Sequence, residues 1–577
     1  MISVVGAMDL SDVSIVRNLY GQNNQYHYYG MNIYCDETHR STPEIVKFTL
    51  QFPLQQLGIV LNKDNDIEIL IADFCLREFV KHIKKINLLR EHQTGKEKYT
   101  GAIYIYEPND LVLLRNTSYI KDDFLNIMLR IRFPVHMMEK RNVIAGKLSV
   151  KLIRKSLARA IRDFIDEFSM DAYHEALTVF IRQQEIRNII KKEGLVSFIA
   201  NGSILPKNHD GTTLQNAIPF IAPKEDEVEF HLSDGFSIKG FGIKNGVTVI
   251  TGGGYSGKST LLDSIMTGIY NHVIGDGREY CITQSNSCKI VAEDGRRITA
   301  MNIAPFIRNI HGKFTDDFST DHASGSTSQA ANIIESISFG CKLLLIDEDR
   351  TATNFMIRDA RMKTIIKYDP IIPFTDRVRD IYENTGTSTI LVIGGSSEYL
   401  DLADNVYLMK DYNLVNYNVE INNTRQHNYE FFKVEDETSI AWIHKRIVDK
   451  ESLNSFRKNP ETGRIQEHLS VELNHIQVGQ MVANIAQLST VFTFPQQVAI
   501  AFCIRAICNN NDMQSDDLLE IANKVYNDVV KEGLNKIYTN SFLIDPDMEL
   551  PTFADIMFTL SRMNDITYKK RRNENES

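Results

Sequence analysis

One glycine-rich stretch decides the fold of this 577-residue chain: Gly252-Gly253-Gly254-Tyr255-Ser256-Gly257-Lys258-Ser259. It fits the pattern G-x-x-x-x-G-K-[ST], in which glycines let successive backbone N–H groups turn inward around an anion. An apolar, β-branched run at 247–250 precedes it, and residues 259–266 have the pattern of a helix. A strand, a glycine-rich turn and a helix in this order predict a phosphate-binding loop rather than an ordinary turn, with the positive end of the helix at the phosphates.

The pattern assigns chemical roles to residues of this loop. Lys258 is expected to reach the β- and γ-phosphates of ATP, and the Ser259 hydroxyl is expected to bind Mg²⁺. The other candidate nucleotide-binding residues of the loop are Gly252, Gly253, Gly254, Tyr255, Ser256, Gly257 and Thr260. The expected cofactors are therefore ATP and Mg²⁺.

A second motif supplies two acidic residues. The apolar run Leu343-Leu344-Leu345-Ile346 is typical of a central parallel strand, and it ends in Asp347 and Glu348. Asp347 is predicted to hold the magnesium shell, and Glu348 to polarise the attacking water. An apolar strand that ends in two acids is common, so this assignment depends on the phosphate loop in the same chain.

A third motif, Ser324-Gly325-Ser326-Thr327-Ser328-Gln329, lies shortly before the acidic strand. Small polar residues followed by a helical pattern indicate a helix N-terminus, which suits an anion. A serine helix cap alone would explain the pattern. Its position before the magnesium strand favours a signature sequence, in which Ser324, Gly325 and Ser326 contact nucleotide.

These motifs, in this order, resemble those of ATP-binding-cassette (ABC) ATPases. The chain resembles one group in particular, the stand-alone predicted ATPases of the ABC class, densely from about Phe198 to Tyr412 and more thinly on either side. The most specific segments are 347–349 and 353–362, and further hallmarks are 198–206, 275–279, 292–296 and 318–331. The resemblance implies an α/β fold, an ABC-type P-loop ATPase domain, and ATP hydrolysis.

The resemblance also implies a composite site. In ABC-like enzymes the signature helix faces the γ-phosphate only across a dimer. Two copies of this chain would then sandwich two ATP molecules, and Ser324 of one copy would act with Lys258 and Glu348 of the other. The expected partner is therefore a second copy of the chain.

The sequence departs from the pattern of transporter cassettes. The strand expected at 389–393 is followed by Gly394-Gly395-Ser396-Ser397 instead of a switch histidine. Asn354 is the nearest equivalent of the D-loop aspartate, and Asn302 or Asp316 stands for the missing lid glutamine. Hydrolysis depends largely on positioning and charge stabilisation, so turnover is expected to be slow without the histidine.

Three regions follow along the chain. Residues 1–198 mix strand-like runs at 67–71 and 103–106 with helical stretches, which predicts an α+β domain. Residues 199–418 alternate strands and helices and form the predicted ABC-class ATPase domain. Residues 419–577 are predicted to be mainly helical, from the apolar spacing at 478–485 and 498–502.

Composition indicates a globular protein. The formal net charge is −10, and no apolar stretch reaches the about 20 residues that a membrane helix requires, so no membrane partner is expected. The beginning of the chain lacks the layout of a secretory signal. The seven cysteines are scattered without a C-x-x-C pair, which predicts reduced thiols and a cytoplasmic protein. Nuclear and mitochondrial locations remain alternatives.

One segment opposes the overall charge. Its basic residues, opposed only by Glu139, are Arg130, Arg132, Lys140, Arg141, Lys147, Lys151, Arg154, Lys155, Arg159 and Arg162. On a helix the apolar residues would share the opposite face: Val150, Ile153, Leu157, Ala160 and Phe164. Such a basic face would neutralise phosphates of RNA or DNA. The alternatives are a solvated helix and a basic subunit contact.

The sequence therefore favours an ABC-class ATPase that hydrolyses ATP in a dimeric sandwich and couples nucleotide state to its flanking domains, with RNA as a candidate partner. The alternative is a nucleotide-gated, nucleic-acid-binding module with slow or incidental hydrolysis. A third hypothesis, an assembly protein that holds ATP permanently, is disfavoured because Glu348 is present.

Overall fold

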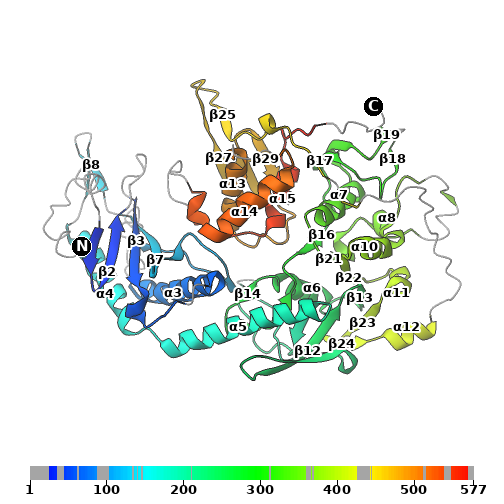
Figure 1. The fold of residues 1–577 in the computed structure, drawn as a ribbon, viewed down its shortest axis with the longest axis horizontal. Coiled ribbons are helices and arrows are strands. Elements are labelled where there is room, and N and C mark those ends of the chain that lie inside the picture. The colour runs from blue at the N-terminus through cyan, green and yellow to red at the C-terminus, as the bar shows by residue number, and fades with distance from the viewer. Residues whose placement is uncertain are drawn as a thin grey trace. The chain divides into compact units, whose positions relative to one another are not determined.

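A computed structural model gives the structure of this protein (Figure 1). The residues that it describes are 25–35, 45–61, 64–86, 103–132, 135–138, 141–144, 147–208, 211–310, 313–358, 365–366, 369–424, 442–443, 445–510, 515–538 and 547–569. Between 132 and 155 only the backbone is described.

The chain divides into two compact units. The first comprises residues 1–180 and 528–550, and the second comprises residues 181–527 and 551–577. Two helices cross the limits of the units: α5 (Met170–Lys192) and α14 (Leu518–Glu532). The predicted domain boundaries after residues 198 and 418 stay predictions.

The first unit contains an antiparallel sheet covered by helices. Its strands lie in the order β1-β2-β3-β7-β4, and β6 also pairs with β7. Their bounds are β1 Gln25–Tyr28, β2 Met31–Cys35, β3 Ile45–Pro53, β4 Ile103–Tyr104, β6 Ser118–Lys121 and β7 Phe124–Arg132. Helices α3 (Asn65–Ile86) and α4 (Lys147–Asp166) pack together, and Phe52, Phe79 and Phe164 meet edge-to-face in the core beneath the sheet. The arrangement of this unit is α+β.

A buried ion pair brings the distant segment 547–550 into this unit. The Arg115 guanidinium donates to Glu549 Oε1 at 2.6 Å and also pairs with Asp73 on α3. The Leu550 N–H donates to the Leu114 carbonyl at 2.9 Å. The strand-like run predicted at 67–71 is wrong, because Ile71 and its apolar neighbours lie on the buried face of α3. Periodicity alone does not distinguish a short apolar run in a strand from one in a helix.

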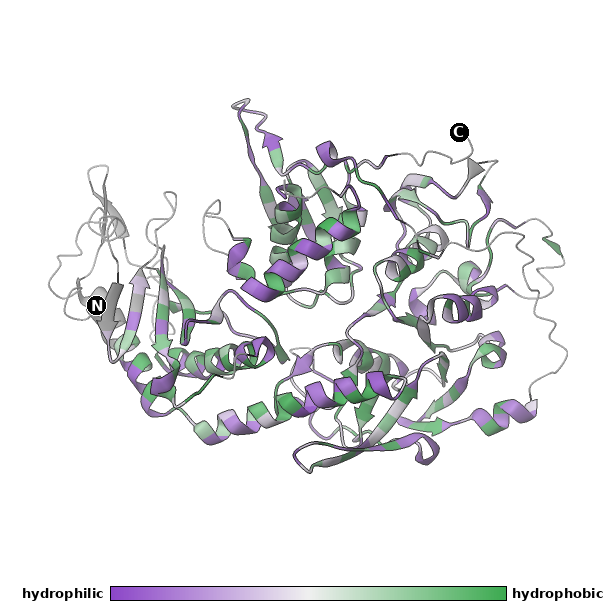
Figure 2. Cartoon of the chain, in the orientation of Figure 1, coloured by the Kyte–Doolittle hydropathy of each residue, from purple (hydrophilic) through white to green (hydrophobic). Residues whose placement is uncertain are grey.

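The second unit is built on a six-stranded sheet in the order β16-β21-β22-β13-β23-β24. The bounds are β13 Val247–Thr251, β16 Ser287–Ile290, β21 Leu343–Asp347, β22 Ser388–Val392, β23 Asn405–Lys410 and β24 Asn413–Asn416. The first five strands in this order are parallel, and only β24 at the edge is antiparallel. Figure 2 shows these strands as predominantly hydrophobic. The α/β class predicted from the sequence is confirmed.

Helices and smaller sheets surround this core. The helices are α6 Lys258–Thr267, α7 Gly325–Ser338, α8 Thr353–Met356, α10 Val378–Thr385, α11 Glu398–Leu402 and α12 Asn418–Thr424. An antiparallel sheet in the order β11-β12-β10-β15 has the bounds β10 Leu195–Ala200, β11 Glu227–His231, β12 Ser237–Lys244 and β15 Cys281–Thr283. Strands β17 (Arg296–Met301) and β20 (Phe318–Ala323) form a pair that leads into α7. The remaining short strands of this unit are β14 Asn271–His272, β18 Asn309–Ile310 and β19 Lys313–Phe314, and those of the first unit are β5 Leu111–Val112, β8 Val135–Met138 and β9 Arg141–Ile144.

The region after residue 445 is more mixed than predicted. Its remaining helices are α13 Phe494–Cys508 and α15 Phe553–Arg562, and its strands are β25 Phe456–Lys458, β26 Ile465–Glu467, β27 Leu469–Glu472, β28 His475–Val478 and β29 Met481–Asn484. The helical prediction for 498–502 is confirmed in α13. The prediction for 478–485 is wrong, because this stretch contains a hairpin that turns at Gly479, with φ +60°. Burial alternates along β29, which is the strand period of two.

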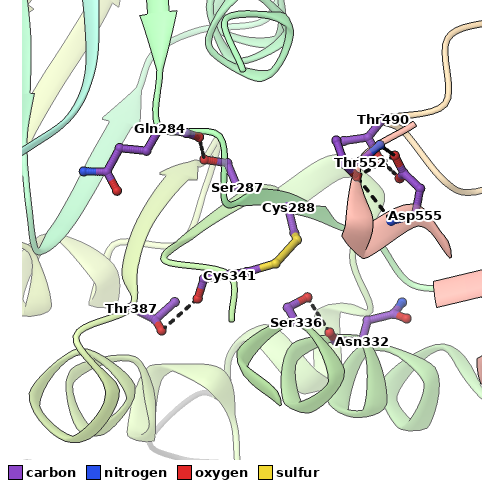
Figure 3. The surroundings of a disulfide bond; sticks show 10 residues. All are labelled: Gln284, Ser287, Cys288, Asn332, Ser336, Cys341, Thr387, Thr490, Thr552 and Asp555. Carbon is purple, nitrogen blue, oxygen red and sulfur yellow. Dashed lines mark hydrogen bonds between the residues drawn. A yellow bond between two sulfur atoms is a disulfide. The ribbon is translucent and has the colours of Figure 1, made fainter. Parts of the chain in front are cut away.

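A disulfide joins Cys288 on β16 to Cys341, which lies two residues before β21 (Figure 3). The Thr387 hydroxyl donates to the Cys341 carbonyl at 3.2 Å beside it. The expectation of reduced thiols is therefore wrong for this pair. Cys75, Cys281, Cys503 and Cys508 are free. The cytoplasmic location stays a prediction. None of the helices in the described part of the chain has the length and apolarity of a membrane span.

A buried network of charges ties α15 to α7 in the second unit. Arg562 on α15 pairs with Glu293, and the Asn332 amide on α7 donates to the same Glu293 carboxylate at 2.9 Å. Arg296 pairs with Glu335 on α7. Burial alone would raise the pKa of Glu293, but the charges of Arg562 and Arg296 outweigh it and lower the pKa to about 2. The Glu293 carboxylate is therefore held in its charged form by its neighbours.

We expect Arg562→Met to destabilise the second unit by about 3–5 kcal/mol, because it leaves the Glu293 charge buried without its partner. Trp442, the single tryptophan of the chain, is 4% exposed in the core of this unit, so its fluorescence reports the unfolding of this unit in urea. The control is Lys239→Met, which breaks an ion pair with Glu229 whose side chains are 54% and 41% exposed. A loss below about 1 kcal/mol for Arg562→Met, the size expected of an exposed pair, would contradict this view of the network.

Candidate functional site

The predicted phosphate loop, residues 252–259, lies between β13 and α6 as the sequence indicated. Gly257 is the N-cap of α6 with φ +101°, a conformation that a residue with a side chain rarely adopts. The Tyr255 side chain is fully exposed and its backbone has φ +59°. The loop therefore places the N-terminus of an α-helix at its end, where the helix dipole favours an anion.

The glycines of the loop are not equivalent. A Cβ at Gly252 would collide with the backbone carbonyl of Met409 on the neighbouring strand β23, and φ there is +150°. Gly253 and Gly254 have nothing within 4 Å of a Cβ position. The close approach of two strands therefore explains the first glycine, whereas the next two leave the space around the loop open.

The Lys258 ammonium is hydrogen-bonded to the backbone of its own loop. Its Nζ donates to the carbonyl oxygens of Gly252 at 2.6 Å and Gly253 at 2.7 Å. The side chain thus lies along the inside of the loop. An ammonium group held by backbone carbonyls is able to exchange them for phosphate oxygens.

The two residues expected at the metal lie together. The Ser259 hydroxyl donates to Asp347 Oδ2 at 3.1 Å, and the Asp349 N–H donates to Asp347 Oδ1 at 3.2 Å. Asp347 is 5% exposed at the end of β21. A hydroxyl and a carboxylate are hard oxygen ligands. Mg²⁺ takes its remaining ligands from water and phosphate, so this donor set fits it.

Glu348 follows Asp347 and is held by the segment after β22. Its Oε2 accepts hydrogen bonds from the Gly394 N–H at 2.5 Å and the Gly395 N–H at 3.2 Å. Its Oε1 accepts a hydrogen bond from the Ser396 hydroxyl. In the sequence, residues 394–397 stand out only by the missing histidine, and this contact was not predicted. The available signal for this contact was the two glycines and the serine that follow β22, the strand beside β21.

The signature residues form a helix cap as expected. Ser324 is the N-cap of α7 and accepts a hydrogen bond from the Thr327 N–H at 3.4 Å. Its hydroxyl also lies 3.2 Å from that of Ser326. Among the described residues, no hydrogen bond or ion pair joins residues 324–326 to the phosphate loop.

The structure also describes the three residues predicted for the D-loop and the lid, Asn354, Asn302 and Asp316. Asn354 is exposed on α8. Helix α8 is tied to α7 because the buried Gln329 side chain accepts a hydrogen bond from the Ala352 N–H at 2.9 Å. Asn302 is buried and accepts from the Ala304 N–H, and Asp316 is exposed, so a lid role for either residue stays a prediction. Residues 359–362 of the predicted hallmark lie outside the described part of the chain.

Parts of the chain match known proteins in sequence. The family model for the P-loop domain of ABC ATPases matches residues 169–446. The uncharacterized protein MJ1628 of Methanocaldococcus jannaschii is 30% identical over 361 residues, which cover 58% of this chain and 77% of that protein.

Two solved structures match a smaller part of the chain. CbiO1 from Clostridium perfringens, part of the ABC transporter complex cbiONQ, is 18% identical over 34% of this chain and 89% of its own, with a TM-score of 0.22. The ADP conformation of MJ1267, an ATP-binding cassette of an ABC transporter, is 14% identical over 39% of this chain and 94% of its own, with a TM-score of 0.24.

We expect Gly252→Ala to weaken ATP binding by about tenfold or more. The new Cβ forces the loop away from Met409, backbone strain costs about 1–3 kcal/mol, and each 1.4 kcal/mol is about tenfold in affinity. The matched control is Gly253→Ala, where a Cβ meets open space. Calorimetric titration with ATP and Mg²⁺ measures both affinities. Equal affinities for the two variants would contradict the close approach at Gly252.

Proposed function

The chain belongs to the ABC ATPase family of P-loop proteins, and on that premise we propose that residues 252–260 bind ATP and that Glu348 serves its hydrolysis. Nucleotide binding and hydrolysis follow from the family. The roles of single residues are our proposal, and one observation carries it: Ser259 and Asp347 are in contact, with Glu348 directly beside them. The phosphate loop, the two proposed metal ligands and the proposed general base lie at one edge of the parallel sheet.

We assign the first role to Lys258. Its ammonium would leave the carbonyls of Gly252 and Gly253 and turn to the β- and γ-phosphates, while the N–H groups of the loop and of Thr260 surround the phosphates. Ser259 and Asp347 would hold Mg²⁺, which when bound neutralises charge on the phosphate oxygens. The contact at 3.1 Å between these two side chains supports this role.

The second role belongs to Glu348. Its carboxylate would orient a water whose oxygen forms a bond to the γ-phosphorus as the bond to the bridging oxygen of the leaving ADP breaks. The water proton passes to the carboxylate. An acid beside the metal ligand, at the end of the same strand, supports this assignment.

We further propose that the active form is a homodimer. Ser324 lies at the exposed N-terminus of α7, a helix of 14 residues, and among the described residues no hydrogen bond joins it to the loop of its own chain. The signature of a second copy would complete the site with its hydroxyl and helix N-terminus. Closure of the two copies around ATP would couple nucleotide state to the flanking domains.

We expect Glu348→Gln to lower the hydrolysis rate by about a hundredfold or more, the usual contribution of a general base, and to trap an ATP-bound dimer. Multi-angle light scattering with ATP and Mg²⁺ measures the dimer. Lys258→Ala is the control, because a chain that does not bind ATP should remain monomeric. Monomers of Glu348→Gln at every ATP concentration, with wild-type activity independent of protein concentration, would contradict the composite site.

A second candidate function concerns nucleic acid. The predicted apolar face of α4 is confirmed for Leu157, Ala160 and Phe164, which are at most 3% exposed. The side chains of Arg159 and Arg162 are 72% and 52% exposed, although Asp163 lies near both. Arg130 instead pairs with Asp547. The side chains of the remaining predicted residues lie outside the described ones: Arg132, Lys140, Arg141, Lys147, Lys151, Arg154, Lys155, Val150 and Ile153.

The exposed charge on α4 supports the proposal that this helix contacts RNA through its phosphates. In that function ATP would gate the binding surface, and hydrolysis would be slow or incidental. The competing hypothesis is that α4 is only a solvated helix. A measurement of RNA binding distinguishes the two hypotheses.

We expect reversal of Lys151, Arg154 and Lys155 to Glu to abolish RNA binding while ATP binding persists. Contacts to phosphates release counterions, so wild-type binding should weaken steeply with salt and show little base preference. The control reverses the exposed Lys121, Lys239 and Lys458, which gives the same change in net charge outside the segment. Gel-shift titration measures binding. Absence of a complex with wild-type protein at low salt, or equal loss in the control, would contradict the proposal.

A further inference from the structure

Residues 394–396, which follow β22, donate hydrogen bonds to the Glu348 carboxylate. We call the Gly394 N–H, the Gly395 N–H and the Ser396 hydroxyl the serine collar. Its position follows from the sheet, because β21 and β22 are parallel and Asp347 pairs with Val392. Glu348 follows β21 directly and Gly394 lies two residues beyond the end of β22, so the two residues emerge at the same edge of the sheet.

The two carboxylate oxygens of Glu348 are held unequally. Oε2 accepts two N–H groups, at 2.5 Å and 3.2 Å, whereas Oε1 accepts, among the described residues, only the Ser396 hydroxyl. Each oxygen of a carboxylate offers about two acceptor sites. Oε2 is thus saturated, and Oε1 keeps one site for a further donor such as water.

The exposure of the collar residues and the space around them agree with the unequal hydrogen bonding of the two carboxylate oxygens. Ser396 is 6% exposed, whereas Gly394 and Gly395 are exposed. A Cβ at Gly394 would lie 3.8 Å from Oε2, and a Cβ at Gly395 would meet nothing within 4 Å. The glycines therefore leave free space next to the carboxylate, while the buried serine supplies a fixed donor.

We propose that Ser396 is the positioning residue of Glu348: with the two glycine N–H groups it fixes the carboxylate so that Oε1 is directed at the attacking water. The inference rests on the proposed function, in which Glu348 is the general base. The chain has no switch histidine after β22. The serine collar supplies positioning at this place instead, by holding Glu348. Ser396 does not contact the reacting atoms and acts through Glu348.

The test compares steady-state ATP hydrolysis of variants that remove or keep the hydroxyl. Ser396→Ala should lower kcat by about tenfold to a hundredfold, the range expected for loss of one hydrogen bond to a charged group. KM and ATP affinity should stay within about twofold, because no hydrogen bond joins Ser396 to the phosphate loop among the described residues. Ser396→Thr, which keeps the hydroxyl, should recover most of kcat. Ser397→Ala is the matched control, since Ser397 is exposed and its hydroxyl points to Glu398 instead.

A double-mutant cycle separates positioning from a structural role. In a Glu348→Gln background, Ser396→Ala should cost no further activity, because its effect passes through the carboxylate. Trp442 fluorescence checks that each variant is folded, and Ser396→Cys, with a weaker donor of similar size, tests the same bond if Ser396→Ala does not fold.

The outcomes are distinct. An unchanged or raised kcat in Ser396→Ala, with Glu348→Gln inactive, would overturn the inference alone. Equal losses from Ser396→Ala in the wild-type and Glu348→Gln backgrounds would also overturn it, because the serine would then act independently of the carboxylate. Full activity of Glu348→Gln would overturn the proposed function itself, and the inference with it.

Discussion

The parallel alignment of β13, β21 and β22 is the constraint on which the site depends. Thr251, Asp347 and Val392 end these three strands, so the phosphate loop, the acidic pair and the serine collar all emerge at one edge of the sheet. Leu343 to Ile346 are fully buried, which fixes the register of β21 between its neighbours. A slip of one residue would turn Asp347 to the opposite face and separate it from Ser259.

Helix α7 connects the signature to the rest of the second unit. Gln329 ties it to the segment that carries Asn354, and Glu335 and Asn332 tie it to the buried charges around Arg562. Separating a buried charge from its partner is costly. A displacement of α7 during nucleotide binding must therefore carry these partners along, which gives the C-terminal helix α15 a physical connection to the signature.

The sequence predicted the parts of the site that are local. A glycine-rich turn that ends in Lys-Ser between an apolar strand and a helix is specific to phosphate binding, and the structure has the expected strand, turn and helix there, with Ser259 in contact with Asp347. The roles of these residues in binding nucleotide and metal stay predictions. Features that depend on pairing between distant segments were missed. Ser396 meets Glu348, 48 residues away in the sequence, only because β21 and β22 lie side by side, and Cys288 meets Cys341 across neighbouring strands. The runs at 67–71 and 478–485 were too short for apolar spacing alone to distinguish a helix from a strand.

The chemical groups of the serine collar determine how the hold on Glu348 responds to pH. A histidine changes its charge between about pH 5 and 8, so a site that positions its base with histidine responds to pH through that ring. Backbone N–H groups and a serine hydroxyl carry no charge to lose in that range. They follow β22 and are already hydrogen-bonded to Glu348 before the carboxylate takes up the water proton. The hold on Glu348 therefore depends on the register of β21 and β22 rather than on a titrating side chain.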